Sequence, residues 1–366
     1  MSGNLEFFHQ ILIQGIESKA SDWHVKEGSG VSLRIAGDMV PMDFVPDHAF
    51  MHDVIESMTR EDQREQYLKT GDLDLSYSPE GIGRFRVNIH RQRAMDAMTL
   101  RHVKSRIMTL EELSLPPVVR KISEAKRGII IVCGTTGSGK STTLAGMLDH
   151  VNKNFPRHII TIEDPIEYEF KDNMCMFEQR EVGLDTCSFQ SALVHALRQD
   201  PDIIMVGEMR DKESFESALQ AADTGHMVLS TLHATNASQA INRILDFFPK
   251  AEQDSIREAL ALNLQATIAQ RLLPKAMGKG VIPVNEIMIN TPMVQKLIRE
   301  NELERLGDAI ASGKEDGMMT FNACLLERIN NGDITEEVGL EASAEPDALR
   351  MNLKGIFVGT GNSILG

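Results

Sequence analysis

Hydrophobic and polar positions in the first part of the chain alternate between a helical and an extended spacing. Residues 5–16 carry apolar side chains at helical spacing, two short extended runs follow, and residues 47–68 have the pattern of two polar-faced helices. Residues 73–77 and 85–89 then alternate apolar and polar side chains on either side of a Pro/Gly turn, which predicts an antiparallel hairpin. Residues 1–103 are therefore expected to form a small α+β domain, with helices on one side of its sheet.

The pattern changes from residue 128 onward, where short apolar runs alternate with helical segments. Strands that are buried on both faces and separated by helices are typical of a parallel sheet covered by helices. Beyond residue 251 the chain is expected to be mostly helical, ending in a tail over residues 351–366 for which the pattern predicts no structure. The predicted strands are residues 129–133, 159–162, 203–206 and 227–229, and the predicted helices are residues 142–151, 189–198 and 212–222.

Length and composition agree with two domains. The chain has 366 residues, of which 42% are hydrophobic and 25% are charged, so two domains can each bury a core. The regular pattern lapses over residues 104–117, which end in two prolines. We expect this segment to link the first domain to an α/β domain over residues 118–366.

Charge and hydropathy exclude several classes of protein. A net charge of −15 argues against a broad nucleic-acid interface, because non-specific binding to phosphates depends on surplus Lys and Arg. No apolar run approaches the roughly 20 residues that cross a bilayer, and the N-terminus lacks the pattern of a signal peptide. The chain is therefore predicted to be cytoplasmic, without a transmembrane segment.

The four cysteines are scattered and form no C-x-x-C pair, which argues against a zinc ribbon. We interpret Cys133, Cys175, Cys187 and Cys324 as small buried hydrophobic residues.

A complete G-x-x-x-x-G-K-S element lies between a predicted strand and a predicted helix. Its glycines let the backbone turn so that N–H groups point at phosphate oxygens. Lys140 supplies a charge to the β- and γ-phosphates, the Ser141 hydroxyl is a ligand for Mg²⁺, and Thr142 is placed to touch the α-phosphate. The predicted ATP-binding residues are Gly134, Thr135, Thr136, Gly137, Ser138, Gly139, Lys140, Ser141 and Thr142.

Two further predicted strands end in carboxylates. Glu208 follows the strand over residues 203–206, where it can polarise an attacking water or hold Mg²⁺ through one; the alternative is a surface glutamate at a strand end. Glu163 is the first acidic residue after another strand and a candidate for the same metal and water site. For Asp164 and Glu167, a role in the turn or a solvated position stays an equal alternative.

Two histidines flank the strand over residues 227–229. His226 precedes it and His233 follows it, and an imidazole can report a γ-phosphate through a hydrogen bond. A purely structural role is the alternative for each.

Arginines on the predicted hairpin of the first domain are a further set of candidates. Arg84 and Arg86 either form a solvated face or reach a nucleotide bound to a neighbouring subunit, and Arg271 is a candidate for nucleotide contact from the second domain.

Taken together, the motifs resemble a known family. The segments GTTGSGKST, ITIEDPIEY, PDIIMVGEMRD and TGHMVLSTLHATNA follow one another like the Walker A, Asp, Walker B and His boxes of the secretion ATPase superfamily. ASDWH near the N-terminus, VQKLIRE and GMMTFNACLLERINNGDIT are similar to segments of its type IV pilus retraction (twitching motility) branch. The resemblance extends from about Ala20 to about Thr335.

The resemblance implies more than the residues alone. It implies a PAS-like N-terminal domain, a RecA-like ATPase domain, and a homo-hexamer that hydrolyses ATP with Mg²⁺ to retract type IV pili. By position, Glu208 becomes the general base, Glu163 an Asp-box acid, and His226 and His233 nucleotide-sensing residues, with Arg84 and Arg86 completing the site. The implied partners are an inner-membrane platform protein, on which the ring docks, and a paralogous pilus ATPase.

Alternatives to the retraction motor stay open. Residues 293–300 keep only the second half of the AIRNLIRE segment that this branch often carries, which suits an accessory ring regulated by nucleotide. A pilus-assembly or type II secretion ATPase would share the four boxes, although many such enzymes carry a zinc-binding cysteine cluster. A nucleic-acid translocase is disfavoured by the acidic charge.

Overall fold

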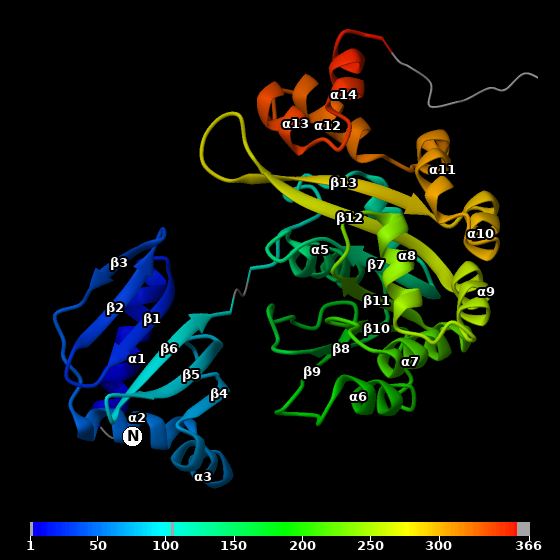
Figure 1. Cartoon of the computed structure of the whole chain (residues 1–366). Helices are drawn as coiled ribbons and strands as arrows, with labels where there is room; N and C mark the ends of the chain where they lie inside the picture. The colour runs from blue at the N-terminus through cyan, green and yellow to red at the C-terminus, as the bar shows by residue number, and fades with distance from the viewer. Residues whose placement is uncertain (1–2, 104–105, 357–366) are drawn as a thin grey trace, which may run out of the picture. The chain divides into compact units, whose positions relative to one another are not determined.

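The computed structural model describes residues 3–103 and 106–356. The chain divides into two compact units, each with its own sheet (Figure 1). Unit 1 comprises residues 1–106 and 165–169, and unit 2 comprises residues 107–164 and 170–366.

Unit 1 is built on a six-stranded sheet in the order β3-β2-β1-β6-β5-β4. Its neighbouring strands are antiparallel, so the predicted hairpin is confirmed: β4 pairs with β5 from Asp72↔His90 to Tyr77↔Phe85. The elements are α1 (Gly3–Glu17), β1 (Ala20–Lys26), β2 (Gly30–Ile35), β3 (Asp38–Pro41), α2 (His48–Met58), α3 (Glu61–Thr70), β4 (Asp72–Tyr77), β5 (Phe85–Gln92) and β6 (Met95–His102).

The core of unit 1 is centred on Trp23 of β1, which is fully buried. Its indole N–H donates to the carbonyl of Ile11 in α1 at 3.1 Å, and its ring meets Phe85 edge-on at 5.4 Å. Gly15 allows α1 to approach this ring, since a Cβ at that position would lie 2.3 Å from the indole. One helix and two strands are therefore fixed around a single side chain.

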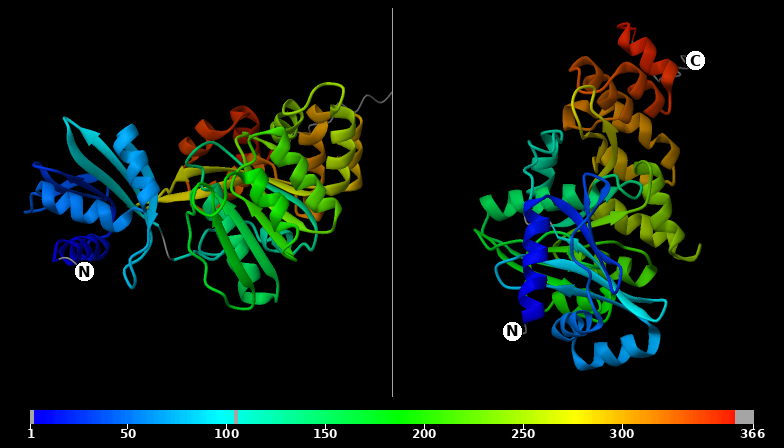
Figure 2. Two further views of the ribbon diagram at one scale, coloured as in Figure 1. Left: turned by 90° about the horizontal axis from the view of Figure 1, so that it is seen from below. Right: turned by 90° about the vertical axis from the view of Figure 1, so that its left-hand side faces the viewer.

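Unit 2 contains a seven-stranded sheet in the order β13-β12-β7-β11-β10-β8-β9, seen from a second direction in Figure 2. The strands are β7 (Gly128–Cys133), β8 (His158–Glu163), β9 (Met176–Glu181), β10 (Ile203–Val206), β11 (Met227–Leu232), β12 (Leu264–Pro274) and β13 (Val281–Ile289). Pairing is parallel throughout except between β12 and β13, which form an antiparallel hairpin. The helices are α4 (Val118–Ser123), α5 (Lys140–Asn154), α6 (Phe189–Ala196), α7 (Lys212–Asp223), α8 (Ala237–Asp246), α9 (Gln253–Asn263), α10 (Pro292–Arg299), α11 (Leu306–Ser312), α12 (Phe321–Asn330), α13 (Glu336–Ala342) and α14 (Pro346–Leu353), with 3-10 turns η1 (Leu303–Arg305) and η2 (Lys314–Asp316).

Helices cover both faces of this sheet, as the sequence predicts. Alternate residues of β7 face opposite sides: Ile129 and Ile131 pack among residues of α6 to α11, whereas Ile130 and Val132 pack among residues of α4 and α5. All six residues of β7 are buried, which explains its unbroken apolar run.

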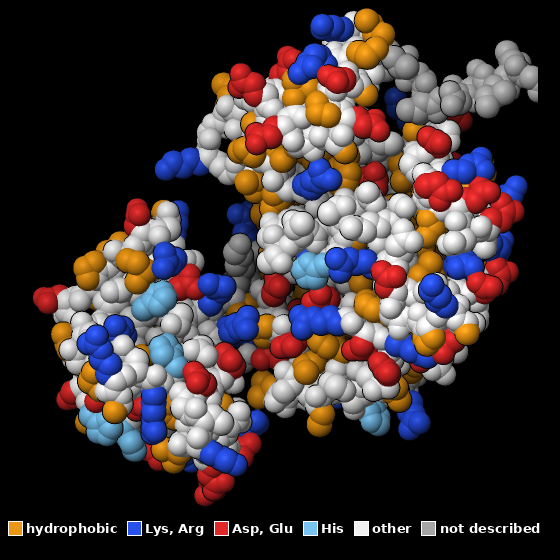
Figure 3. Space-filling model, viewed as in Figure 1, with side chains coloured by type: hydrophobic (Ala, Val, Ile, Leu, Met, Phe, Trp, Pro, Cys, Tyr) orange, Lys and Arg blue, Asp and Glu red, His pale blue; other side chains and the backbone are white. Residues whose placement is uncertain are grey.

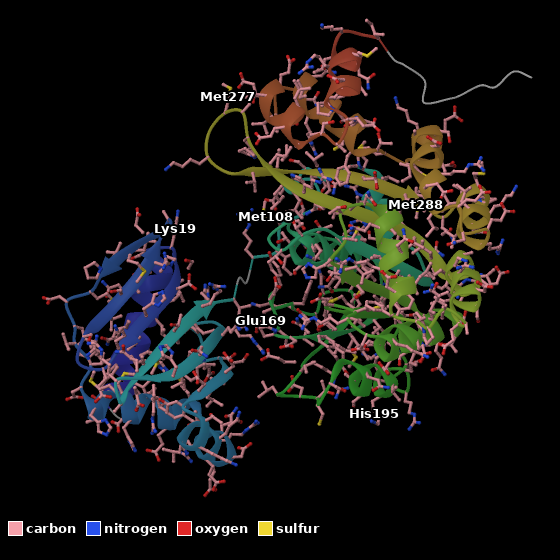
Figure 4. The ribbon with its side chains drawn as sticks, viewed as in Figure 1. Lys19, Met108, Glu169, His195, Met277 and Met288 are labelled. Carbon is pink, nitrogen blue, oxygen red and sulfur yellow. The ribbon has the colours of Figure 1, made fainter. Side chains whose placement is uncertain are left out.

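The expectation of a mostly helical chain after residue 251 is wrong for residues 264–289. These residues form the hairpin of β12 and β13, against which α12 to α14 pack through a separate apolar cluster. Met288 of β13 is buried, whereas Met277, in the turn that joins the two strands, is 83% exposed (Figure 4). Tertiary pairing with β7 decides the conformation of β12.

The predicted linker over residues 104–117 is only partly described, because residues 104 and 105 lie outside the described residues. Residues 107–117 belong to unit 2, where Leu110 and Leu115 are buried in the cluster that contains α5. Residues 357–366 of the tail also lie outside the described residues.

The surface of unit 2 carries interspersed acidic and basic side chains (Figure 3). On α9 and α10, for example, Arg299 lies 2.9 Å from Glu258. Over the residues that the structure describes, no helix has both the length and the apolar composition needed to cross a membrane.

Candidate functional site

The predicted motifs of unit 2 converge on one edge of its sheet. β7, β11, β10 and β8 are adjacent and parallel, so their carboxyl ends lie at the same edge. The segments that leave these four ends carry the Gly-rich loop, His233, Glu208 and Glu163, respectively. In open parallel sheets this edge is where ligands bind.

The Gly-rich loop between β7 and α5 has the geometry of a phosphate-binding turn. Gly139 caps the start of α5 in the left-handed region, with φ of 85°, and Gly137 has φ of 78°. Lys140 is the first residue of α5, and its Nζ donates to the carbonyls of Gly134 and Thr135 at 3.0 and 3.1 Å. The lysine thus lies across the loop, with the amino end of a 15-residue helix beside it.

The remaining loop residues differ in exposure. Thr135, Thr136 and Gly137 are exposed, whereas Ser138 is only 3% exposed and its N–H donates to the carbonyl of Thr135. Ser141 and Thr142 follow Lys140 in the first turn of α5 and are half-buried. The nine predicted P-loop residues thus form the loop between β7 and α5 together with the first turn of α5.

Glu208 lies just beyond β10 and is held from two sides. One carboxylate oxygen accepts from Arg210 at 2.7 Å, and the other lies 3.2 Å from Nε2 of His233. The side chain of Glu208 is 19% exposed, so it remains open to solvent while its orientation is fixed. The backbone of this segment is tied to β11 because the Thr231 hydroxyl donates to the carbonyl of Gly207.

Glu163 is the last residue of β8 and is 7% exposed. Its Oε1 accepts from the Thr161 hydroxyl at 2.8 Å and from the Gln179 side-chain amide at 3.2 Å. The carboxylate is therefore positioned by its own strand and by β9. Asp164 and Glu167, the less specific candidates of this segment, are exposed.

His226 lies at the opposite edge of the same sheet. It precedes β11, and its carbonyl accepts from the N–H of Gly128, the first residue of β7. Its Nδ1 lies 3.0 Å from the carbonyl of Ala221 in α7 and 3.0 Å from the hydroxyl of Thr224. Because β11 has six residues, about 20 Å separates its two ends, so the structure does not bring His226 and His233 to one site within a chain.

Arg271 also turns away from the loop. Its guanidinium donates to the carbonyl of Ala342 at 2.8 Å and lies over the ring of Phe321 at 4.5 Å, so it joins β12 to α12 and α13. This contact with the C-terminal helices is a structural role that the sequence interpretation did not weigh for Arg271.

The two hairpin arginines belong to unit 1. Arg84 immediately precedes β5 and donates to the Ser76 hydroxyl at 3.3 Å, and Arg86 lies on β5 with an exposed side chain.

Two side chains that orient the candidate carboxylates were missed by sequence reasoning, namely Gln179 and Arg210. Arg210 lies two residues after Glu208, within reach of its carboxylate, so proximity in sequence was an available signal. Gln179 acts from β9, a strand that the hydrophobic pattern did not predict.

Comparison with known proteins agrees with the motif series. The profile of the family described as "Type II/IV secretion system protein" matches residues 4–307. The chain is 40% identical to the type IV pilus ATPase PilU of Pseudomonas aeruginosa, over 95% of this chain and 91% of PilU. It is also 40% identical to the pilus retraction ATPase PilT of that organism, over 92% of this chain and 98% of PilT.

A solved structure of similar fold is that of the pilus retraction motor PilT with bound ADP. It superposes with a TM-score of 0.85 at 41% sequence identity and covers 92% of this chain and 97% of that one. The fold expected from the motifs is thereby confirmed.

Proposed function

Because the chain belongs to the type II/IV secretion system protein family, and within it to the branch of PilT and PilU, we propose that it is an ATP-hydrolysing motor that drives type IV pilus retraction. The observation that carries the proposal is the edge of unit 2 at which the P-loop, Glu208 with His233, and Glu163 meet. A protein that only binds nucleotide needs the P-loop but not the carboxylates. The paired and oriented carboxylate is the additional feature that hydrolysis requires.

In the proposed reaction the P-loop holds the phosphates of ATP. Its backbone N–H groups and the amino end of α5 face the phosphate oxygens, and Lys140 moves its donor bonds from loop carbonyls to the β- and γ-phosphates. Thr142 then lies beside the α-phosphate. Because the lysine already lies across the loop, only a side-chain rotation is needed to engage substrate.

Glu208 is proposed as the general base. His233 and Arg210 hold the two carboxylate oxygens in a fixed orientation, which favours one position for the attacking water. His233 is also placed to report the γ-phosphate, because its ring contacts the base directly.

The residues at this edge suit Mg²⁺. The hydroxyl of Ser141 and the carboxylates of Glu208 and Glu163 are hard oxygen donors, which Mg²⁺ prefers. Ser141 would bind it directly and Glu208 through a water molecule. Bound there, Mg²⁺ would neutralise charge that develops on the transferred phosphoryl group.

Assembly is part of the proposal. We place the chain in a cytoplasmic homo-hexamer docked on an inner-membrane platform protein, with Arg84 and Arg86 of unit 1 completing the site of a neighbouring subunit. Closure of one domain on the next subunit would couple ATP binding to movement.

A second candidate function is an accessory retraction ATPase that acts with a paralogous motor. It is favoured by residues 293–300, which keep only the second half of the AIRNLIRE segment. Restoration of retraction in cells that lack their own retraction motor supports the main-motor role, whereas restoration only when that motor is present supports the accessory role.

The test is steady-state ATP hydrolysis by wild type beside Glu208→Gln, with the oligomer mass recorded in the same samples. Wild type is expected to turn over ATP as a hexamer, and the variant to bind ATP while turnover falls by about a hundredfold or more, since it loses the base. Glu315→Gln, at an exposed glutamate of the turn η2, serves as a matched control and should retain turnover. An assembled wild-type hexamer that hydrolyses nothing would remove the motor function.

A further inference from the structure

A buried glutamine beneath the P-loop lies outside the motif series. Gln270 of β12 is 2% exposed. Its Nε2 donates to the carbonyl of Ser138 at 2.7 Å, and its Oε1 accepts from the Thr143 hydroxyl at 2.8 Å and from Nδ2 of Asn285 at 3.1 Å. One amide thus joins the P-loop, α5 and β13.

The orientation of this amide is fixed by its partners. The carbonyl of Ser138 can only accept, so the nitrogen of Gln270 must face it. The oxygen must then face Thr143 and Asn285, which both donate to it. A reversed amide would place its oxygen against the carbonyl oxygen of Ser138 and leave buried polar groups without partners, which is unfavourable.

The contact controls the peptide between Ser138 and Gly139. In a trans peptide the C=O and N–H point in opposite directions. Because Gln270 holds the C=O of Ser138 toward β12, the N–H of Gly139 faces away from β12, which is the side that a bound phosphate would occupy. If this peptide turned over, a carbonyl oxygen would face the phosphates and repel them.

Two glycines of the loop lie close to the same residue. A Cβ on Gly139 would lie 2.9 Å from Nε2 of Gln270, and a Cβ on Gly134 would lie 2.5 Å from the Gln270 carbonyl oxygen. Gly134 and Gly139 therefore allow β12 to lie close to the loop, in addition to allowing the loop to turn.

We propose that Gln270 is a positioning residue of the nucleotide site, which fixes the Ser138–Gly139 peptide so that the loop presents N–H groups to the phosphates of a nucleotide. The inference rests on the proposed ATP site and adds a residue to it. Gln270 contacts no phosphate; it acts through the loop backbone.

The experiment compares the full-length wild type with Gln270→Glu and Thr143→Val, by equilibrium binding of a fluorescent ATP analogue at about pH 5.5 and about pH 8. Gln270→Glu keeps the size of the side chain and removes the donor to Ser138. Thr143→Val removes one hydrogen bond to the same amide, while Asn285 and Ser138 still orient it, so this variant is the control for loss of a buried hydrogen bond that does not involve the loop.

At the higher pH, Gln270→Glu is expected to bind about tenfold or more weakly than wild type, because a carboxylate opposes the Ser138 carbonyl. Burial at this position raises the pKa of the introduced carboxyl, so at the lower pH its protonated form donates to the Ser138 carbonyl, and affinity recovers relative to wild type at the same pH. Thr143→Val is expected to stay within about threefold of wild type at both pH values. In steady-state turnover, Gln270→Glu is expected to raise KM more than it lowers kcat. The reason is that the loop contacts the phosphates equally in the ground state and in the transition state.

Equal affinity of Gln270→Glu and wild type at the higher pH overturns the proposal, and so does an equal loss in Thr143→Val. If Gln270→Glu does not fold, Gln270→Met keeps the length without a donor and is expected to bind weakly at both pH values; wild-type affinity in that variant also overturns it. If the wild type binds ATP without hydrolysing it, the proposed motor function is wrong. The comparison of affinity between wild type and the Gln270 variants still tests the role of Gln270.

Discussion

Adjacent residues of a strand face opposite sides of the sheet, and this separates Gln270 from Arg271. Gln270 faces the P-loop, whereas Arg271 faces the C-terminal helices. Arg271 was the predicted nucleotide contact because its positive charge suits a phosphate. Charge alone does not tell which face a side chain occupies, so the neighbouring glutamine was missed.

Glu286 of β13 carries a prediction about pH. Its carboxylate accepts from the N–H of Ala237 at the start of α8, yet desolvation by burial raises its pKa above the ordinary value of 4.5. A carboxyl with a raised folded-state pKa stabilises the native state below its unfolded pKa, and this contribution is lost as pH rises through the folded pKa.

Glu286→Gln does not titrate at this position. The unfolding temperature of the variant minus that of wild type is therefore expected to become more positive as pH rises from about 4.5 to about 8. Thermal unfolding of both proteins across this range measures the difference. A difference that does not change with pH, or that shifts in favour of wild type, contradicts the raised pKa of Glu286.

Reactivity of the cysteines is the second prediction at this scale. Burial raises the pKa of Cys133 to about 12 and also raises the pKa of Cys175 and Cys324, whereas Cys187 is exposed. The sequence interpretation of all four as buried is therefore wrong for Cys187. Native protein should react with a maleimide at Cys187 alone, because only its thiolate is accessible.

Peptide mapping of the labelled protein identifies the site, with Cys187→Ser as the control that should lose the label. Rapid labelling of Cys133 in the native state would show that the strand before the P-loop opens.

At the scale of elements, a strongly apolar strand could be predicted from the sequence and a polar or mixed one could not. β7, β8, β10 and β11 are buried on both faces, and their apolar runs identify them. β9 is an edge strand with mostly polar residues, so no hydrophobic period marks it.

The hairpin of β12 and β13 was missed for a different reason. β12 contains many good helix formers, and its pairing with β7 overrides that local preference. β13 contains Pro283, which argues against a central strand but is tolerated here because β13 is at the edge of the sheet.

The same limits apply to the candidate site. Residues within the motifs, such as Lys140 and Glu208, could be predicted because each follows a strand end whose apolar run is clear. The roles of Gln179 and Gln270 depend on the long-range pairing of β9 and β12. The position of His226, in contrast, follows from the sequence, because His226 precedes β11 and His233 follows it. Position relative to a strand end was thus the informative signal.

The contact of α1 with β1 leads to a prediction about packing. Gly15→Ala places a methyl group 2.3 Å from the Trp23 indole, so α1 must shift and the hydrogen bond from Trp23 to Ile11 weakens. We expect unit 1 to lose about 1–3 kcal/mol of stability despite the better helix propensity of alanine. Tryptophan fluorescence during denaturant unfolding measures the loss, because Trp23 lies in the core of unit 1.

Gly3→Ala in the same helix is the control, because a Cβ there meets nothing within 4 Å, and it should be close to neutral. Equal stability of Gly15→Ala and Gly3→Ala contradicts the close packing of α1 on β1.

At the scale of the whole molecule, each unit buries its own apolar cluster. The main cluster of unit 1 is drawn from residues between 5 and 100, and those of unit 2 from residues after 109. Separate cores are the physical basis for separate unfolding, because each unit retains its own burial when the other opens.

Trp23, the only tryptophan in the chain, allows the unfolding of unit 1 to be followed separately by fluorescence. Its emission comes from the core of unit 1, whereas most of the helical circular dichroism comes from unit 2. We expect the fluorescence and dichroism transitions of the heated protein not to coincide, and coincident curves would show that the units unfold as one. In the native protein, a change of tryptophan emission on adding ATP would report that the surroundings of Trp23 in unit 1 respond to nucleotide bound at the P-loop of unit 2.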